Sequence, residues 1–255
     1  MNPKILFLDI ETAPGIAFIW SLWKEVASMS QVEQDWYVLC WCAKWLGQKK
    51  MHKSLLPEFK DLYAENPTDD SLVMRKLWDL LDAADIVVAH NAVKFDIKRA
   101  NTRFLHHGMC PPSPYRVVDT LKIARRHFAF MSNKLDDLGK GLGLGQKKKH
   151  AGIKMWADCL AGSEKAWKMM VAYCEQDVRL LQRVYTKLAP YADGMPNLGV
   201  YVDRPVCPRC GSKKMVRRGF VFKGLSRFRQ YRCSACGSWS RSRKREDEGR
   251  ALSGA

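Results

Sequence analysis

Five side chains spread along the sequence could together bind divalent metal ions. In chain order they are Asp9, Glu11, Asp96, Tyr173 and Asp177. Carboxylate oxygens are the ligands that Mg²⁺ and Mn²⁺ prefer, and two such ions can hold a phosphodiester for attack by water. The set therefore indicates hydrolysis of a phosphodiester, provided that the fold brings the three segments together.

The local spacing of these residues suits a common site. Asp9 and Glu11 are two apart in a predicted strand over residues 4–12, so both side chains point to one face. Tyr173 and Asp177 are four apart in a predicted helix over residues 163–188 and share one side of it. Asp96 falls in the first turn of a predicted helix over residues 95–107, where the helix dipole favours an acid. Each pattern alone also fits a structural role, such as acids at a solvated strand end.

Together the segments resemble the motifs of the DEDDy 3′–5′ exonucleases of the ribonuclease H-like superfamily. The matching residues are Asp9-x-Glu11 in the first motif, Asn91-x-x-x-Phe95-Asp96 in the second and Tyr173-x-x-x-Asp177 in the third. The chain is similar in this respect to the proofreading domains of family B DNA polymerases, over about residues 4–190. Tyr173, four residues before the last acid, is typical of the tyrosine subclass.

The resemblance implies a two-metal-ion mechanism that uses two Mg²⁺ or Mn²⁺ ions. Asp9, Glu11 and Asp177 would hold the ion nearer the nucleophilic water, and Asp9 and Asp96 would hold the second ion. Tyr173 would orient the water for attack on the terminal phosphodiester. The residues expected to contact nucleic acid here are Asn91, Phe95, Lys147, Lys148 and Lys149. For the lysine run, a solvated loop is an equal alternative.

The predicted elements favour an α/β fold. Strands over residues 4–12, 38–46 and 53–56 come first, and strands and helices alternate afterwards. This order predicts a mixed central sheet flanked by helices, and the resemblance implies that it is ribonuclease H-like.

Two Cys-x-x-Cys pairs near the C-terminus predict a small zinc ribbon. Cys207 and Cys210 are followed, after a gap of 22 residues, by Cys233 and Cys236. Four cysteines at this spacing are typical of one tetrahedral structural Zn²⁺. Few large apolar residues surround them, so the metal is expected to carry much of the module's stability. A disulfide, or two unrelated thiol pairs, is the alternative.

The net charge of +17 indicates a polyanionic partner. Residues 203–255 hold 15 basic and four acidic residues, which concentrates the charge in the C-terminal module. Nucleic acid is the expected partner, DNA rather than RNA, and an anionic membrane surface is the alternative. The basic residues expected to contact it are Arg217, Arg218, Lys223, Arg227 and Arg229. Docking of a protein partner is the other interpretation of the ribbon.

These observations predict an exonuclease domain over residues 1–190, a linker over 191–204, a zinc ribbon over 205–240 and a disordered basic tail over 241–255. The expected substrate is single-stranded DNA ends. Trimming of RNA 3′ ends or cleavage of branched DNA would use the same residues. A non-catalytic nucleic-acid-binding adaptor is the alternative of another class.

The chain has no long uncharged apolar run that could span a membrane, and Asp9 comes too early for the apolar segment of a signal peptide. A cytoplasmic location without a membrane span is therefore expected.

Overall fold

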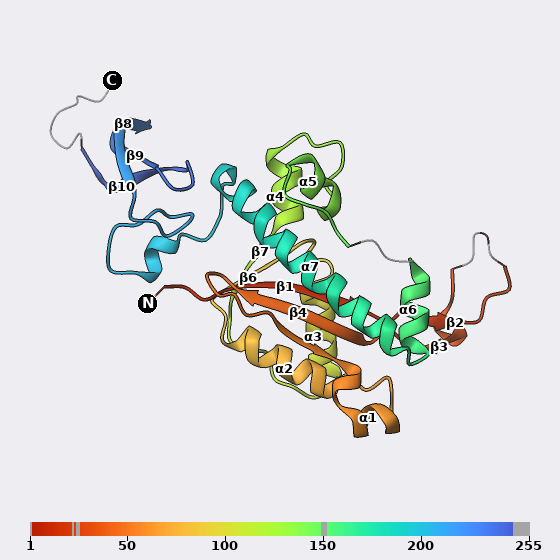
Figure 1. Ribbon diagram of the computed structural model, residues 1–255. Coiled ribbons are helices and arrows are strands. Elements are labelled where there is room, and N and C mark those ends of the chain that lie inside the picture. The colour runs from red at the N-terminus through yellow and green to blue at the C-terminus, as the bar shows by residue number, and fades with distance from the viewer. Residues whose placement is uncertain (1, 22, 24–25, 149–151, 247–255) are drawn as a thin grey trace. The chain divides into compact units, whose positions relative to one another are not determined.

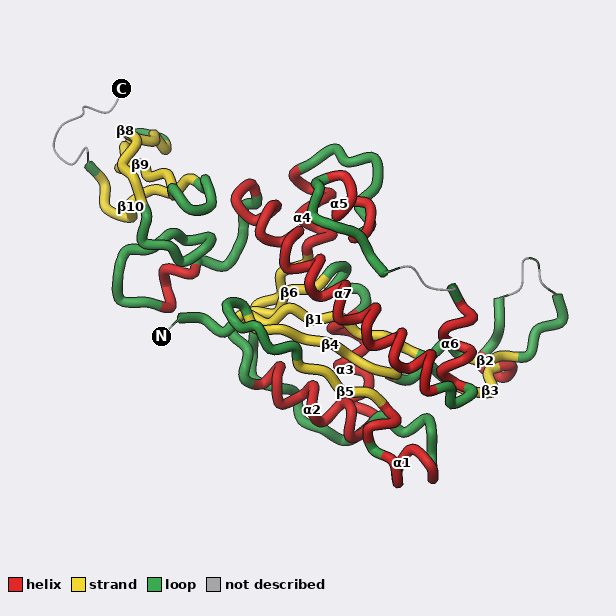
Figure 2. The backbone as a smooth tube through the Cα atoms, viewed as in Figure 1, coloured by secondary structure: helices red, strands yellow, loops and turns green. Residues whose placement is uncertain are grey.

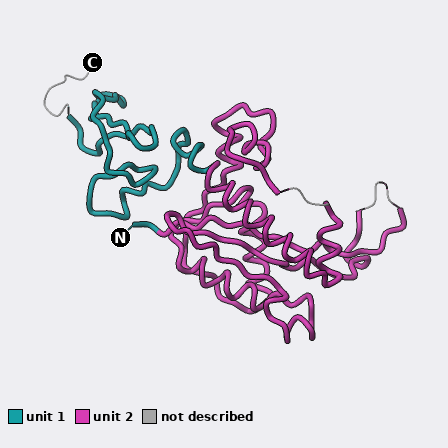
Figure 3. The backbone as a smooth tube through the Cα atoms, in the orientation of Figure 1, with its two compact units in different colours: residues 1–3, 185–255 teal, residues 4–184 magenta. Residues whose placement is uncertain are grey.

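The computed structural model describes residues 2–21, 23, 26–148 and 152–246 (Figure 1). The chain folds into two compact units (Figure 3). The larger is Lys4–Val184, and the smaller combines Met1–Pro3 with Tyr185–Ala255. The division falls inside the long helix α7 (Glu164–Leu188) rather than at residue 190. The domain boundaries expected from the sequence stay predictions.

The larger unit is built on a five-stranded mixed sheet. In spatial order its strands are β5 (His52–Leu55), β4 (Val38–Trp45), β1 (Ile5–Thr12), β6 (Ile86–Ala89) and β7 (Arg116–Asp119). β1 is antiparallel to β4 and parallel to β6, and β6 is parallel to β7. The central strands are apolar and almost fully buried, as expected for a sheet covered on both sides. Figure 2 shows the sheet with its flanking helices, and the predicted mixed α/β fold is confirmed.

The two faces of the sheet are covered by different helices. On β4, the Trp41 indole Nε1 donates to the Val73 carbonyl of α2 (Ser71–Asp82) at 2.9 Å. The next residue, Cys42, places its Sγ 3.9 Å from the Val171 carbonyl of α7. Because successive strand residues point to opposite faces, α2 and α7 lie on opposite sides of the sheet. Asp9 is paired with Cys42 in the strand register, so Asp9 and Glu11 belong to the α7 face.

The remaining elements of the larger unit frame this sheet. They are α1 (Lys60–Glu65), α3 (Asp96–His106), α4 (Thr120–His127), α5 (Leu135–Gly141), α6 (Ile153–Leu160), the short strands β2 (Ile16–Ala17) and β3 (Val32–Gln34), and 3-10 turns at Met29–Gln31 and Leu56–Glu58. Figure 1 shows α4 and α5 beside α7. None of the helices in the described ranges is both long and apolar enough to cross a membrane.

A close approach between α5 and α7 fixes the loop that follows α5. A Cβ atom on Gly139 would lie 2.8 Å from Leu180 Cδ1 and 2.6 Å from the Gly145 carbonyl oxygen. Only glycine fits there, because real Cβ atoms do not approach other atoms so closely. The loop is thereby held against α7 and carries Lys147 toward the third motif.

The smaller unit contains a three-stranded antiparallel sheet in the order β10-β9-β8. Its strands are β8 (Met215–Lys223), β9 (Ser226–Cys233) and β10 (Trp239–Arg245). The segment expected to be a linker, residues 191–204, begins at the last residue of the 3-10 turn Ala189–Tyr191 and contains a second such turn, Leu198–Tyr201. In the second turn, Leu198 N donates to the Pro208 carbonyl at 2.9 Å. The expected disordered tail is wrong at its start, because residues 241–245 pair with β9 as part of β10. The rest of that tail beyond Glu246 lies outside the described residues.

Candidate active site and cysteine cluster

Three acids from β1 and α7 form one cluster. Asp9, Glu11 and Asp177 each offer a carboxylate oxygen, and these oxygens all lie within 4.8 Å of one another. Cys174 of α7 places its Sγ 3.5 Å from the Asp9 carbonyl oxygen, which brings the third motif against the first. The acids of the first and third motifs therefore lie side by side, as their spacing in the strand and in the helix predicts.

Asp96 reaches the same end of β1 by another route. Its Oδ1 accepts a hydrogen bond from Ile10 N at 3.2 Å, and its side chain is buried. β6 pairs with β1 only as far as Phe7, so this amide has no strand partner on that side. The Asp96 carboxylate is therefore the acceptor that a neighbouring strand would otherwise supply to this amide. Its charge is also close enough to Asp9 for the two carboxylates to repel each other.

Lys147 extends its ammonium group into the carboxylate cluster. Its Nζ lies 2.9 Å from the Tyr173 hydroxyl and pairs with the Asp177 carboxylate. Of the predicted basic run, Lys148 is exposed and Lys149 lies outside the described residues. The sequence predicts Lys147 as a nucleic-acid contact or as part of a solvated loop, because no local pattern shows that the loop after α5 folds back onto α7.

The carboxylate cluster is electrostatically unfavourable without a divalent cation, even with the Lys147 ammonium beside Asp177. Burial and the charge of Asp177 raise the pKa of Asp9 to about 7. Burial and the neighbouring carboxylates raise the pKa of Glu11 and of Asp96 well above their usual range. Burial also raises the pKa of Asp177, although Lys147 opposes the change. Like charges confined in a buried space disfavour ionisation, and a bound divalent cation would reverse the effect.

The donor set fits a divalent metal ion. Asp9 Oδ2 and Asp177 Oδ1 are buried and accept no hydrogen bond from any described residue. Buried carboxylate oxygens normally have partners, so two without one in the same cluster indicate a ligand. Oxygen-only coordination of this kind suits Mg²⁺ or Mn²⁺.

Asn91 and Asp119 shape the turn that delivers Asp96. Asn91 has a φ of 71°, a left-handed conformation that asparagine tolerates better than other side chains bearing a Cβ. Its amide donates to Asp119 Oδ1 at 3.0 Å, and its carbonyl accepts from Phe95 N at 3.0 Å. Asp119 also accepts from Leu121 N at 3.0 Å at the start of α4. Its role is therefore structural, and Asn91 contributes through its backbone.

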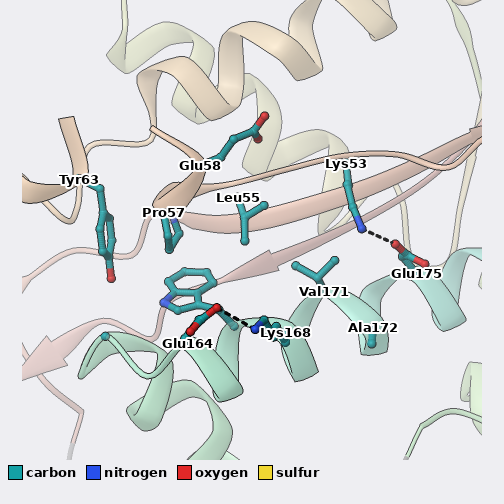
Figure 4. Close-up of a pocket in the computed structure, with 12 residues that line it drawn as sticks. Lys53, Leu55, Pro57, Glu58, Tyr63, Glu164, Lys168, Val171, Ala172 and Glu175 are labelled. Atoms are coloured by element: carbon teal, nitrogen blue, oxygen red, sulfur yellow. Dashed lines mark hydrogen bonds and ion pairs between the residues drawn. The ribbon is translucent and has the colours of Figure 1, made fainter. Parts of the chain in front are cut away.

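A separate cleft of about 540 Å³ lies between β5, α1 and α7 and contains none of the five predicted catalytic residues (Figure 4). Leu55, Pro57 and Val171 give it an apolar wall. Two ion pairs join charged residues of its lining, Lys53 with Glu175 at 2.8 Å and Lys168 with Glu164 at 2.7 Å. The carboxylate cluster, rather than this cleft, offers unpaired groups for chemistry.

The four cysteines of the smaller unit converge as predicted. One Sγ from each of Cys207, Cys210, Cys233 and Cys236 lies within 4.8 Å of the others, and the four are free thiols. Gly211 and Gly237 have φ values of 71° and 79°, so their positive φ lets the chain turn after each pair. Burial opposes ionisation of Cys233, but the amides of Cys236 and Ala235 lower its pKa to about 7.

Ser238 is a member of this cluster that the sequence did not reveal. Its buried Oγ lies 3.1 Å from the Sγ of Cys207 and 3.1 Å from that of Cys236. A hydroxyl there can donate to a thiolate and so adjust the charge of a metal-binding sulfur. The donor set of four thiols suits zinc.

Residues 42–189 match a family model described as RNase_H superfamily. The chain belongs to the RNase H superfamily. Among solved structures it is similar to the family B DNA polymerase from the hyperthermophilic archaeon Pyrobaculum calidifontis, with a TM-score of 0.55 and 15% identity. The match covers 74% of this chain and 25% of the polymerase chain, and it shows a shared fold. No curated protein sequence matches the chain. The predicted membership of this superfamily is confirmed, although the matched range begins after Asp9 and Glu11.

Proposed function

We propose that the chain is a metal-dependent 3′–5′ exonuclease that hydrolyses single-stranded DNA ends. The observation that carries the proposal is the partly buried cluster of Asp9, Glu11 and Asp177, in which two buried carboxylate oxygens have no partner among the described residues. The DEDDy-like spacing of the acids and membership of the RNase H superfamily support the same function. The resemblance to proofreading domains supports the 3′–5′ direction and the DNA substrate.

In this proposal the four acids are metal ligands. Asp9, Glu11 and Asp177 hold one Mg²⁺ or Mn²⁺, and Asp9 and Asp96 hold the second. Bound ions of this kind supply Lewis-acid stabilisation of the attacking and leaving oxygens. Asp96 stays oriented by its hydrogen bond from Ile10 N, and the rigid central strand keeps Asp9 and Glu11 side by side.

Tyr173 orients the attacking water, and Lys147 orients Tyr173. Burial and the charge of Asp177 raise the pKa of Tyr173 to about 12, so the phenol keeps its proton at neutral pH. A neutral hydroxyl can donate to or accept from a water and so fix its direction of approach. Lys147 contacts both the Tyr173 hydroxyl and Asp177, which orients the phenol relative to the third motif.

The electrostatics argue against a non-catalytic adaptor. Burial of repelling carboxylates lowers the stability of the fold, and a protein that only binds nucleic acid has no use for such a cluster. A cluster that is unfavourable until a cation arrives is expected at a functional site.

The proposal includes a role for the smaller unit, which binds nucleic acid. Its four cysteines hold one Zn²⁺. Phe220 lies opposite Arg229, and Phe222 opposite Arg227, so both pairs share one face of the sheet. The guanidinium carbons of Arg227 and Arg229 lie 4.7 and 4.4 Å from the Phe220 ring centroid. Arg217 pairs with Tyr231 on the same two strands, while Arg218 falls in a bulge of β8. Arginines beside aromatic rings suit phosphate contact and base stacking.

The charge of this sheet fits the same partner. The sequence holds no acid between Arg204 and Arg245, so the three strands present positive charge almost alone. Glu246 is the acid that meets the sheet, paired with Arg229 at 2.9 Å. Each phosphate contact adds to the salt dependence of binding. Variants Arg217→Gln and Lys223→Gln should each reduce that dependence, measured as the slope of log affinity against log salt.

The test of the nuclease function uses one DNA strand labelled at its 5′ end in one sample and at its 3′ end in another. With Mg²⁺ or Mn²⁺, the 5′-labelled strand should shorten stepwise, and the 3′-labelled strand should release its label at once as a mononucleotide. Asp177→Asn should remove both reactions, whereas Asp79→Asn on the exposed side of α2 should leave them intact. The same assay with RNA and with branched DNA distinguishes the alternative substrates. Absence of metal-dependent shortening in every substrate would refute the proposal.

A further inference from the structure

A second pocket adjoins the carboxylate cluster. Its volume is about 400 Å³, and its walls include Thr12, Gly15, Trp36, Arg99, Ile153 and Trp156. It combines two indole rings with one guanidinium group. None of these residues belongs to the motifs that indicate the nuclease site.

Residues that line this pocket are next to the catalytic residues in the sequence or contact them in the fold. Thr12 directly follows Glu11, and its carbonyl accepts from Trp156 Nε1 at 3.1 Å. The Trp156 ring meets the Tyr173 ring edge-on, with centroids 6.4 Å apart. Arg99 lies about one helical turn after Asp96 on α3. The walls of the pocket are therefore connected to all three motifs.

The Arg99 guanidinium is the group that indicates a ligand. It stacks on Trp36 with its central carbon 3.9 Å from the ring centroid, and it lies 5.2 Å from the Phe95 centroid. Within the described part of the chain its side chain forms no hydrogen bond or ion pair, and its Nη1 is buried. The nearby acid Asp35 accepts instead from the Trp36 amide at 2.7 Å. A partly buried cation without an ion pair is unfavourable, so an anionic partner is expected.

We propose that this pocket binds one of the two nucleotides that flank the scissile phosphodiester. The base stacks on the indole of Trp36, and the phosphate pairs with Arg99, while Trp156 lines the same pocket. Single-stranded nucleic acid is recognised in this manner because every base offers a flat face and every nucleotide a negative charge. The inference rests on the proposed nuclease function, since it places the substrate strand beside the catalytic carboxylates.

Binding, rather than cleavage, provides the test. The full chain is dialysed free of Mg²⁺ and Mn²⁺, and its affinity for a 5′-fluorescein-labelled 12-nucleotide strand is measured by anisotropy. Two further strands lack the base of the 3′-terminal or of the penultimate nucleotide. Loss of one of these bases should weaken binding roughly 5- to 150-fold, the usual range for one stacked base. The loss at the other position should be much smaller.

Two variants and a matched control assign the effect to the pocket. Trp36→Ala should bind the intact strand as weakly as the parent binds the abasic one, and the missing base should then make little difference. Arg99→Gln should weaken binding of every strand and reduce the salt slope by about one. Arg75→Gln on α2 removes a similar arginine–tryptophan stack, 5.6 Å from Trp78, and should change neither quantity.

The outcomes separate this inference from the nuclease proposal. If Arg99→Gln and Trp36→Ala bind all three strands like the parent, the pocket is not a nucleotide subsite, whether or not the parent hydrolyses DNA. If Trp36→Ala does not fold, Arg99→Gln and the abasic strands decide the matter, because the guanidinium forms no ion pair with a described residue and its loss should leave the fold intact. If the chain binds as predicted but never cleaves, the nuclease proposal fails, and the pocket is a binding site for a nucleotide of the strand without a scissile bond beside it.

Discussion

Replacement of Asp9 by asparagine should stabilise the metal-free protein at alkaline pH. The carboxyl has an ordinary pKa of 3.8 and a folded-state pKa of about 7, so its ionised form is disfavoured in the folded chain. Below about pH 4 the group is protonated in both states and has no effect on stability. Between about pH 4 and 7 the unfolded chain ionises first, so stability falls as the pH rises, and the loss is complete above pH 7.

The size of the effect follows from the displaced pKa. At ~1.36 kcal/mol for each tenfold change in proton affinity, the change from 3.8 to about 7 gives at most about 4 kcal/mol above pH 7. The remaining carboxylates relax when Asp9 becomes neutral, so we expect Asp9→Asn to gain roughly 2–4 kcal/mol at pH 8 and at most about 1 kcal/mol at pH 4.5. For a unit of this size the gain corresponds to a rise of roughly 5–15 °C in Tm.

Thermal unfolding at the two pH values measures this gain. The samples are dialysed free of Mg²⁺ and Mn²⁺ without a chelator, which leaves tightly bound zinc in place. Asp79→Asn on α2 serves as the control and should not change Tm at either pH. Added Mn²⁺ should stabilise the parent more than Asp9→Asn, because only the parent has the complete ligand set. Equal stability of Asp9→Asn and the parent at pH 8 would refute the electrostatic reasoning.

Four further predictions test other parts of the structure. Tyr173→Phe should keep metal and strand binding but slow single-turnover hydrolysis roughly 10- to 1000-fold, while Tyr63→Phe leaves the rate unchanged; an unaltered rate in Tyr173→Phe would make the phenol a packing residue. Lys147→Gln should tighten Mn²⁺ binding roughly 3- to 10-fold in a calorimetric titration, because a cation paired with Asp177 is removed, and Lys148→Gln should not. Asn91→Val should lose about 1–2 kcal/mol of unfolding free energy in urea, because its φ of 71° is strained for a branched side chain, whereas Asn91→Gly should be nearly neutral. Cys207→Ser should lose one equivalent of zinc and expose residues 207–245 to protease while the larger unit keeps its Tm; Cys110→Ser, outside the cluster, should retain the zinc.

Much of the fold follows from local patterns in the sequence. The strand predicted over residues 4–12 becomes β1, and the strand predicted over residues 38–46 becomes β4. The predicted long helix becomes α7 with both residues of the third motif on it. These elements are predictable because alternation and helical periodicity are properties of neighbouring residues. The two Cys-x-x-Cys pairs are similarly local, and only their approach to each other requires the fold.

What the sequence could not predict depends on contacts between distant segments. Lys147 reaches Asp177 because α5 packs closely on α7 at Gly139, which no local pattern reveals. Arg99 and Trp36 meet across α3 and the segment before β4, so their stack is visible only in three dimensions. The sequence predicts residues 241–245 as the start of a disordered tail because these charged residues lack an apolar pattern, but they pair with β9 as part of β10.

The central claim is that Asp9, Glu11 and Asp177 together hold a divalent metal ion. Anomalous diffraction from crystals grown with Mn²⁺ and a short DNA strand tests it most directly, because the Mn²⁺ signal locates the ion without reference to activity. We expect a Mn²⁺ peak within coordinating distance of all three carboxylates, and its loss in crystals of Asp177→Asn. Ordered DNA at the site with no Mn²⁺ peak among these carboxylates would show that they do not form a metal site.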